Sequence, residues 1–124
     1  QHGKGHYRGE FAVNAHKDRH RKSLEAMQPV LAYIRDHLHK PIRMRDLAPL
    51  AGMSEKYFIH YFRQTLGISP GRYVHQLKMN RARELLYRDQ FTIKQISEQI
   101  GYPDPYSFSK AFKKHYNVSP SRFV

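Results

Sequence analysis

A stretch of about twenty residues occurs twice in this chain, and this repeat restricts the fold more than any other feature. The first copy contains LAGMSEKYFIHYFRQTLGISP, and the second, some fifty residues later, contains QIGYPDPYSFSKAFKKHYNVSP. Gly52 aligns with Gly101, and after one extra residue at Pro103 the offset becomes fifty. The residues that then match are Phe58 with Phe108, Phe62 with Phe112, Ser69 with Ser119, Pro70 with Pro120, Arg72 with Arg122, Tyr73 with Phe123 and Val74 with Val124. A match of this length predicts two copies of one structural unit.

Each copy carries the start and stop signals of two helices separated by a short turn. Thr92 and Gln95 have the spacing of a capping box that opens a helix, and Gly101 closes that helix. Ser54 and Asp104 are expected to cap the second helix of each copy, a bond that contributes about 1 kcal/mol. Helix, short turn with glycine, helix is the order of a helix-turn-helix unit.

Prolines mark further boundaries. Ser69-Pro70 and Ser119-Pro120 repeat the start of a third helix, in which a capping residue precedes a proline. Pro49 falls inside the first short helix if that helix begins at Met44. It would remove an internal hydrogen bond there, so we expect the helix to start late or to be kinked.

The segment 71–89 joins the copies and carries an apolar stripe of Val74, Leu77, Ala82, Leu85 and Leu86. A unit of about 45 residues is near the lower size limit for folding alone, so one helix shared by both units is physically reasonable. At 1.5 Å per residue this helix is about 27 Å long, of the order of the ~34 Å between recognition elements one DNA turn apart.

The fold class is therefore predicted to be all-α, with two helix-turn-helix subdomains joined by a long shared helix, about seven helices in total. We expect a basic, His-rich linker or arm at 1–22 and a folded domain at 23–124. The domain begins with an amphipathic helix from Leu24 that ends before Pro41. The first helix-turn-helix is expected at about 44–66, the connector at about 70–89 and the second helix-turn-helix at about 92–116.

Charge indicates the class of partner. The 124 residues contain 22 Lys plus Arg against 10 Asp plus Glu, and the net charge of +12 favours a polyanion. Charge alone does not choose among DNA, RNA and an anionic membrane. No apolar run approaches the roughly 18 residues of a membrane span, and no secretory signal is visible. We expect no membrane partner and a cytoplasmic location, and association with the nucleoid is implied only by the family resemblance described below.

Metal binding and catalysis are not expected. The chain has no Cys, which leaves no disulfide and no thiolate metal site. His16 and His20 are four residues apart and His37 and His39 lie nearby, but a zinc site needs three or four arranged ligands and no HExxH pattern is present. No GxSxG, P-loop or paired-carboxylate signature appears either, so no catalytic residue and no cofactor are proposed.

The second helix of each copy has one apolar and one polar side. Phe58, Phe62, Phe108 and Phe112 recur four residues apart and are expected in the core rather than stacked on bases. The other faces present Lys56, Ile59, His60 and Arg63 in the first copy, and Tyr106, Ser109, Lys110 and Lys113 in the second. Units that share a scaffold but differ at exposed positions are suited to reading different base pairs.

Residue chemistry suggests individual base contacts. Lys110 can donate to guanine O6 and N7, and His60 can donate or accept at base edges. Ile59 could meet a thymine methyl group, whereas Ser109 tolerates several bases. A good bidentate contact discriminates between bases by about 1–3 kcal/mol.

Other residues suit the phosphate backbone, which sets affinity and register. Arg63, Lys113 and Lys114 are expected there, together with the helix N-terminus at Ser54. The matching N-terminus at Asp104 is less suited, because the carboxylate would repel phosphate. The connector carries Arg81, Arg83 and Arg88. For each of them, solvation of the helix surface and contact with the DNA backbone are equally expected.

Residues 24–124 resemble the DNA-binding domain of AraC/XylS-type transcriptional regulators. The similarity rests on LAGMSEKYFIHYFRQTLGISPGRYV, KMNRARELL and IKQISEQIGYPDPYSFSKAFKKHYNVSPSRF. The resemblance implies a seven-helix domain that binds as one asymmetric unit, with both recognition helices in successive major grooves on one face of the DNA. Its seventh helix would begin at Ser119.

The resemblance also implies roles for single residues. The family's base-contacting positions fall on Lys56, Ile59 and His60 in the first recognition helix, and on Pro105, Tyr106, Ser109 and Lys110 in the second. Phosphate positions fall near Arg63 and Lys113. Pro105 has no side-chain donor, which argues against direct readout at that position.

The resulting prediction is a bacterial transcription factor domain that binds a specific site in double-stranded DNA and acts near RNA polymerase. Family members commonly carry an N-terminal effector or dimerisation domain, for which this chain has no room, and residues 1–22 would be the linker to it. The alternative is a non-specific basic helical protein that binds RNA or DNA. A His-dependent metal binder or enzyme is the third candidate.

Overall fold

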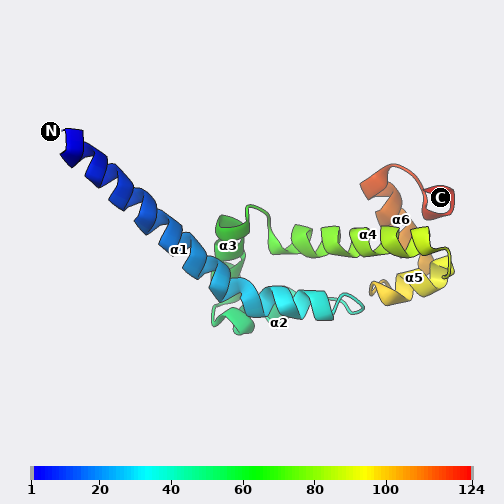
Figure 1. Ribbon diagram of the computed structural model, residues 1–124. Coiled ribbons are helices and arrows are strands. Elements are labelled where there is room, and N and C mark those ends of the chain that lie inside the picture. The colour runs from blue at the N-terminus through cyan, green and yellow to red at the C-terminus, as the bar shows by residue number, and fades with distance from the viewer. Residues whose placement is uncertain (1, 124) are drawn as a thin grey trace.

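The computed structural model describes the backbone of residues 2–123 and the side chains of residues 19–123. This part of the chain contains seven α-helices and one 3₁₀ helix, and no strand (Figure 1). In chain order these are α1 (His2–Asp36), α2 (Met44–Leu47), η1 (Ala48–Ala51), α3 (Glu55–Leu66), α4 (Pro70–Arg88), α5 (Ile93–Gln99), α6 (Pro105–Tyr116) and α7 (Pro120–Phe123). The predicted all-α class is confirmed.

Helix α4 is the axis of the arrangement. Figure 1 shows α3 beside the first turns of α4, with the C-terminal half of α1 running along the same part of the molecule. At the other end of α4 lie α5, α6 and α7. The 19 residues of α4 span about 28 Å at 1.5 Å per residue. The two helix-turn-helix units are thus held at opposite ends of one rigid helix.

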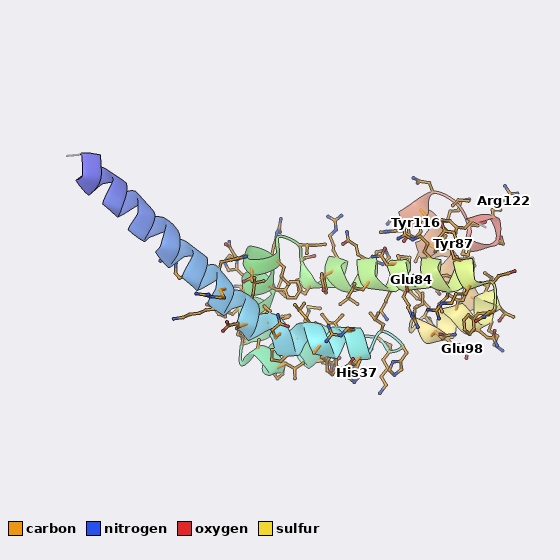
Figure 2. The ribbon with its side chains drawn as sticks, in the orientation of Figure 1. His37, Glu84, Tyr87, Glu98, Tyr116 and Arg122 are labelled. Carbon is orange, nitrogen blue, oxygen red and sulfur yellow. The ribbon has the colours of Figure 1, made fainter. Side chains whose placement is uncertain are left out.

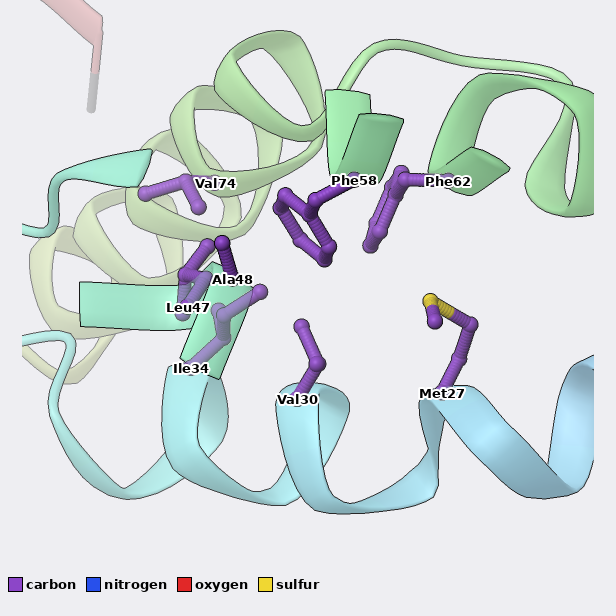
Figure 3. Close-up of a cluster of buried hydrophobic side chains, with 8 residues drawn as sticks. All are labelled: Met27, Val30, Ile34, Leu47, Ala48, Phe58, Phe62 and Val74. Carbon is purple, nitrogen blue, oxygen red and sulfur yellow. The ribbon is translucent and has the colours of Figure 1, made fainter. Parts of the chain in front are cut away.

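The molecule has two hydrophobic cores rather than one. The first cluster consists of Met27, Val30, Ile34, Leu47, Ala48, Phe58, Phe62 and Val74 (Figure 3). The second cluster consists of Met79, Ala82, Leu85, Leu86, Ile96, Ile100, Phe108 and Phe112. The first half of α4 therefore packs on the first unit and its second half on the second unit.

The repeated phenylalanines hold these cores together. Phe58 and Phe62 are fully buried with ring centroids 5.7 Å apart, and Phe108 and Phe112 repeat this at 5.7 Å. Full burial of a side chain of this size stabilises the fold by about 1.5–3 kcal/mol. Their predicted place in the core is confirmed.

The predicted helix caps are present. Ser54 Oγ accepts a hydrogen bond from Tyr57 N at 3.3 Å, and Asp104 Oδ1 accepts one from Ser107 N at 2.7 Å. Thr92 forms the reciprocal capping box with Gln95. Each bond satisfies a backbone group that the first helical turn leaves unpaired.

The first short helix does not start late, because α2 begins at Met44, but its regular α-helical part ends before Pro49. Helix α2 ends at Leu47 and the chain continues as the 3₁₀ helix η1, with Pro49 in its first turn. A proline at this place loses no hydrogen bond, because the first N–H groups of a helix have no partner within it.

Helix α1 is longer than its apolar pattern predicts. The period begins at Leu24, but the helix begins at His2 and includes the segment expected to be a linker or arm. Ala, Lys, Arg and Glu in this segment have high helix propensity, and no proline precedes Pro29. Pro29 removes one internal hydrogen bond, and Figure 1 shows that α1 is bent. The role of 1–22 as a linker stays a prediction.

None of the helices in the described part of the chain combines the length and the apolar character that a membrane crossing requires.

Candidate nucleic-acid interface

Helix α3 presents the residues expected to contact DNA on the side away from the first cluster. Lys56, His60 and Arg63 are exposed, and Ile59 is 39% exposed, which is high for an isoleucine. The cap at Ser54 starts this helix, and the buried Phe58 orients it. The structure therefore brings the first set of candidates to one accessible helix.

Helix α6 repeats the arrangement in the second unit. Pro105, Lys110 and Lys113 are exposed, and Tyr106 is 75% exposed at the start of the helix. Ser109 differs from expectation, because its side chain is half-buried. It follows the buried Phe108 in the chain and so lies at the edge of the packed face.

The candidates for phosphate contact lie at the ends of the same two helices. Lys113 and Lys114 are exposed in the last turn of α6, and Arg63 is exposed in the last turn of α3. Ser54 is exposed, but its hydroxyl already caps α3. Its contribution to an anion site would be to hold the free backbone N–H groups of the first turn in place.

Two histidines meet where α4 passes α6. The rings of His75 and His115 lie 5.2 Å apart in an edge-to-face arrangement. Partial burial lowers the pKa of His75, and the charges of His115 and Lys114 lower it further. The packing of α6 against α4 thus disfavours the protonated form of His75.

Two arginines of the connector, Arg81 and Arg83, have partners within the protein. Arg81 lies 3.5 Å from Glu84, and the guanidinium of Arg83 lies 5.8 Å from the centre of the Tyr116 ring. The Tyr116 hydroxyl in turn donates to Asn80 at 3.4 Å. In Figure 2 Glu84, Tyr87 and Tyr116 lie together near the C-terminal end of α4. Arg83 thus lies against the second unit, whereas the pair of Arg81 and Glu84 is an exposed contact within α4.

Lys78 is an important residue that the apolar pattern does not reveal. It is only 8% exposed, and its ammonium group donates to three backbone carbonyls. Burial lowers its pKa to about 8, so it is still protonated at neutral pH. One signal was present in the sequence: Lys78 is four residues from both Val74 and Ala82, which places it on the buried stripe.

Tyr61 makes a second long-range contact that the sequence does not specify. Its hydroxyl donates to Ser23 Oγ at 2.9 Å and so joins α3 to α1. The aromatic ring also lies 5.9 Å from that of Tyr57. Tyr61 is half-buried and packs against the first cluster.

The described side chains contain no group of three or more His, Cys, Asp or Glu residues that could hold a metal ion. His16, which raised the question, lies outside the side chains that the structure describes.

Comparison with known proteins places this arrangement in a family. A sequence profile described as a helix-turn-helix domain matches residues 47–124. LumQ of Photobacterium leiognathi, a probable transcriptional regulator, is 32% identical over 104 residues, which are 82% of this chain and 42% of LumQ. The chain spans less than half the length of the curated regulators that it matches.

Solved structures agree with the sequence match. A Chromobacterium violaceum transcriptional regulator of the AraC-type DNA-binding class is 28% identical, with a TM-score of 0.70 over 81% of this chain and 89% of that one. The DNA-binding domain of AdpA, solved in complex with a target DNA, shares the fold with a TM-score of 0.71 at 24% identity, over 76% of this chain and 85% of that one.

The chain therefore belongs to the AraC-type helix-turn-helix family, whose members are DNA-binding regulators of transcription. The family resemblance seen in the sequence is confirmed. Membership does not favour the alternative of a non-specific basic RNA- or DNA-binding protein.

Proposed function

We propose that this domain binds one specific site in double-stranded DNA, with α3 in one major groove and α6 in the next. The observation that carries the proposal is the pair of 12-residue helices, each capped and anchored by two buried phenylalanines, at opposite ends of α4. Their exposed residues differ, which suits two half-sites of different sequence. The same fold in AdpA has been solved with a target DNA, which supports DNA as the ligand.

Each candidate has a role in this proposal. Base edges are read by Lys56, Ile59 and His60 on α3, and by Tyr106, Ser109 and Lys110 on α6, with Pro105 packed against the groove without a donor. Phosphates are neutralised by Arg63, Lys113 and Lys114, and the first turn of α3 behind Ser54 adds backbone donors. The half-buried Ser109 reaches less far and contributes least to readout.

The wider setting is also part of the proposal. Residues 23–124 form the DNA-binding domain, and 1–22 lead to an N-terminal effector or dimerisation domain. The matched residues are 42% and 36% of the length of two curated regulators, which is consistent with a further domain. The domain works in the cytoplasm, on the nucleoid, at sites near RNA polymerase. We propose no catalytic step and no cofactor for this chain, in agreement with relatives named as regulators of transcription.

Selection of bound duplexes from a random DNA pool tests the proposal. Two unlike half-sites with centres about 10–10.5 base pairs apart are the expected result. The winning duplex should bind about 10³-fold or more tightly than scrambled DNA at the same salt concentration. Recovery of no motif, with equal binding to every sequence, would show that the domain contacts phosphates only.

A further inference from the structure

The strongest unexplained feature is the buried lysine of the connector. Lys78 lies between Leu77, which packs on the first cluster, and Met79, which belongs to the second. It therefore stands at the residue where α4 passes from one core to the other. Its side chain is only 8% exposed. Because burial of an ammonium group is costly, specific contacts must offset that cost.

The hydrogen bonds of Lys78 reach both helix-turn-helix units. Its Nζ donates to the carbonyls of Leu38 at 2.7 Å and Lys40 at 2.9 Å, in the turn that follows α1. It also donates at 2.7 Å to the carbonyl of Ile100, the residue that ends α5. An ammonium group has three donors, so the three carbonyls use all of them.

The acceptors suit a positive charge. Leu38 and Lys40 follow the C-terminal end of α1, and Ile100 is the C-cap of α5. Carbonyls at helix C-terminal ends lack partners within the helix and carry partial negative charge. One side chain thus satisfies the C-cap carbonyl of α5 in the second unit and two carbonyls of the turn after α1, whose Leu38 packs on the first cluster.

Gly101 permits the close approach on which this contact depends. It has φ +75°, and a Cβ at this position would lie 2.8 Å from the Lys40 carbonyl carbon and 2.9 Å from Lys78 Nζ. Gly52 is the matching residue of the first copy and has a similar φ of +68°, but nothing lies within 4 Å of its would-be Cβ. The second glycine therefore has a contact between the units that the first one lacks.

We propose that Lys78 fixes the orientation of the two helix-turn-helix units and so determines which spacing between half-sites the domain accepts. The part about DNA spacing rests on the proposed function. One added base pair moves a half-site by about 3.4 Å and turns it by about a tenth of a turn. A domain whose units are locked by Lys78 follows such a change poorly, whereas a domain held by α4 alone adapts.

The first test compares the wild-type chain with Lys78→Met on the selected duplex. The duplex is also made with one base pair inserted or deleted between its halves, and with either half scrambled. Lys78→Met should weaken binding to the full site about tenfold and flatten the preference among spacings, because the units no longer act as one preorganised pair. Affinity for each single half should stay within about twofold of wild type.

Glycine substitutions give an independent test that leaves all charges in place. Gly101→Ala should repeat the flattened spacing preference, since its methyl group displaces Lys40 and Lys78. Gly52→Ala is the matched control, because it bears the same backbone strain without a contact between the units. A spacing preference unchanged in Lys78→Met, or half-site affinities lost together with it, would overturn the proposal.

A measurement without DNA separates the two proposals. The chain has no cysteine, so Gln64→Cys on α3 and Glu98→Cys on α5 allow two spin labels, at exposed residues assigned no role in DNA binding. The label-to-label distance distribution should be narrow in the otherwise wild-type chain and with Gly52→Ala, and broad with Lys78→Met or Gly101→Ala. A narrow distribution with Lys78→Met refutes the locking role. A broad one, together with failure to select any bipartite site, supports the lock and refutes the proposed specific binding of two half-sites.

Discussion

At the scale of single residues, the contact between His75 and His115 makes stability depend on pH. His75 lies on α4 and His115 on α6, with their rings 5.2 Å apart. The pKa of His75 is lowered first by burial and then by His115 and Lys114. Protonation of His75 therefore works against the packing of the second unit on the connector.

The sign of the effect follows from proton linkage. Since the pKa of His75 is below 6.5 in the folded state, the folded chain binds fewer protons than the unfolded chain just below that pH. Stability from this group is complete above pH 6.5 and is lost as the pH falls toward the folded-state pKa. We predict that His75→Gln removes part of the loss in unfolding free energy between pH about 7.5 and about 5.5, on either side of the ordinary imidazole pKa.

Urea unfolding at both pH values measures this difference. His60→Gln, on the exposed face of α3, is the matched control and should follow the wild type. If wild type and His75→Gln lose the same free energy on acidification, the histidine contact has no part in acid sensitivity.

At the scale of elements, α6 separates two kinds of DNA contact along a single helix. Lys110 lies in the middle of the helix and Lys114 in its last turn, and both are exposed. A residue that reads a base edge discriminates between sequences, whereas one that meets phosphate strengthens all binding equally.

We therefore expect different results from two alanine substitutions on this helix. Lys110→Ala should weaken the preferred site by about 1–3 kcal/mol and relax base preference in one half of it only. Lys114→Ala should weaken selected and scrambled duplexes by equal factors and leave the preferred sequence unchanged. Affinity measured against a panel of single-base variants distinguishes them. Uniform weakening by both substitutions would remove Lys110 from the base-reading set.

The sequence predicts the features that depend on interactions between residues close together in the chain. Ser54 and Asp104 cap groups three residues away, and Pro49 lies in the first turn of η1, directly after the end of α2. The four core phenylalanines follow from helical period alone. Lys78 could not be assigned, because its acceptors lie 22, 38 and 40 residues away in the chain. The start of α1 at His2 was missed because the apolar period begins only at Leu24.

At the scale of the whole molecule, two small cores share one helix, and the chain carries a net charge of +12. Neither unit alone surrounds a large core, so the connector stabilises both by supplying Val74 to one and Met79, Ala82, Leu85 and Leu86 to the other. Exposed basic residues lie on α3 and on α6, so an arrangement in which both units face the same duplex brings positive charge from each of them to the phosphates.

Salt dependence tests whether both units contact DNA at the same time. Binding to DNA releases counterions, and the slope of log K against log salt is about −0.9 for each phosphate neutralised. Arg63 is the candidate in the first unit and Lys113 the candidate in the second. If both units are bound, Arg63→Gln and Lys113→Gln should each reduce the slope by about 0.9, and the double variant by about 1.8.

Arg35→Gln removes an exposed cation of α1 with no assigned role in DNA binding and should leave the slope unchanged. If one of the two single variants keeps the wild-type slope, the residue that it replaces does not neutralise a phosphate in the complex. If both keep it, the assignment of Arg63 and Lys113 to the phosphate backbone is wrong.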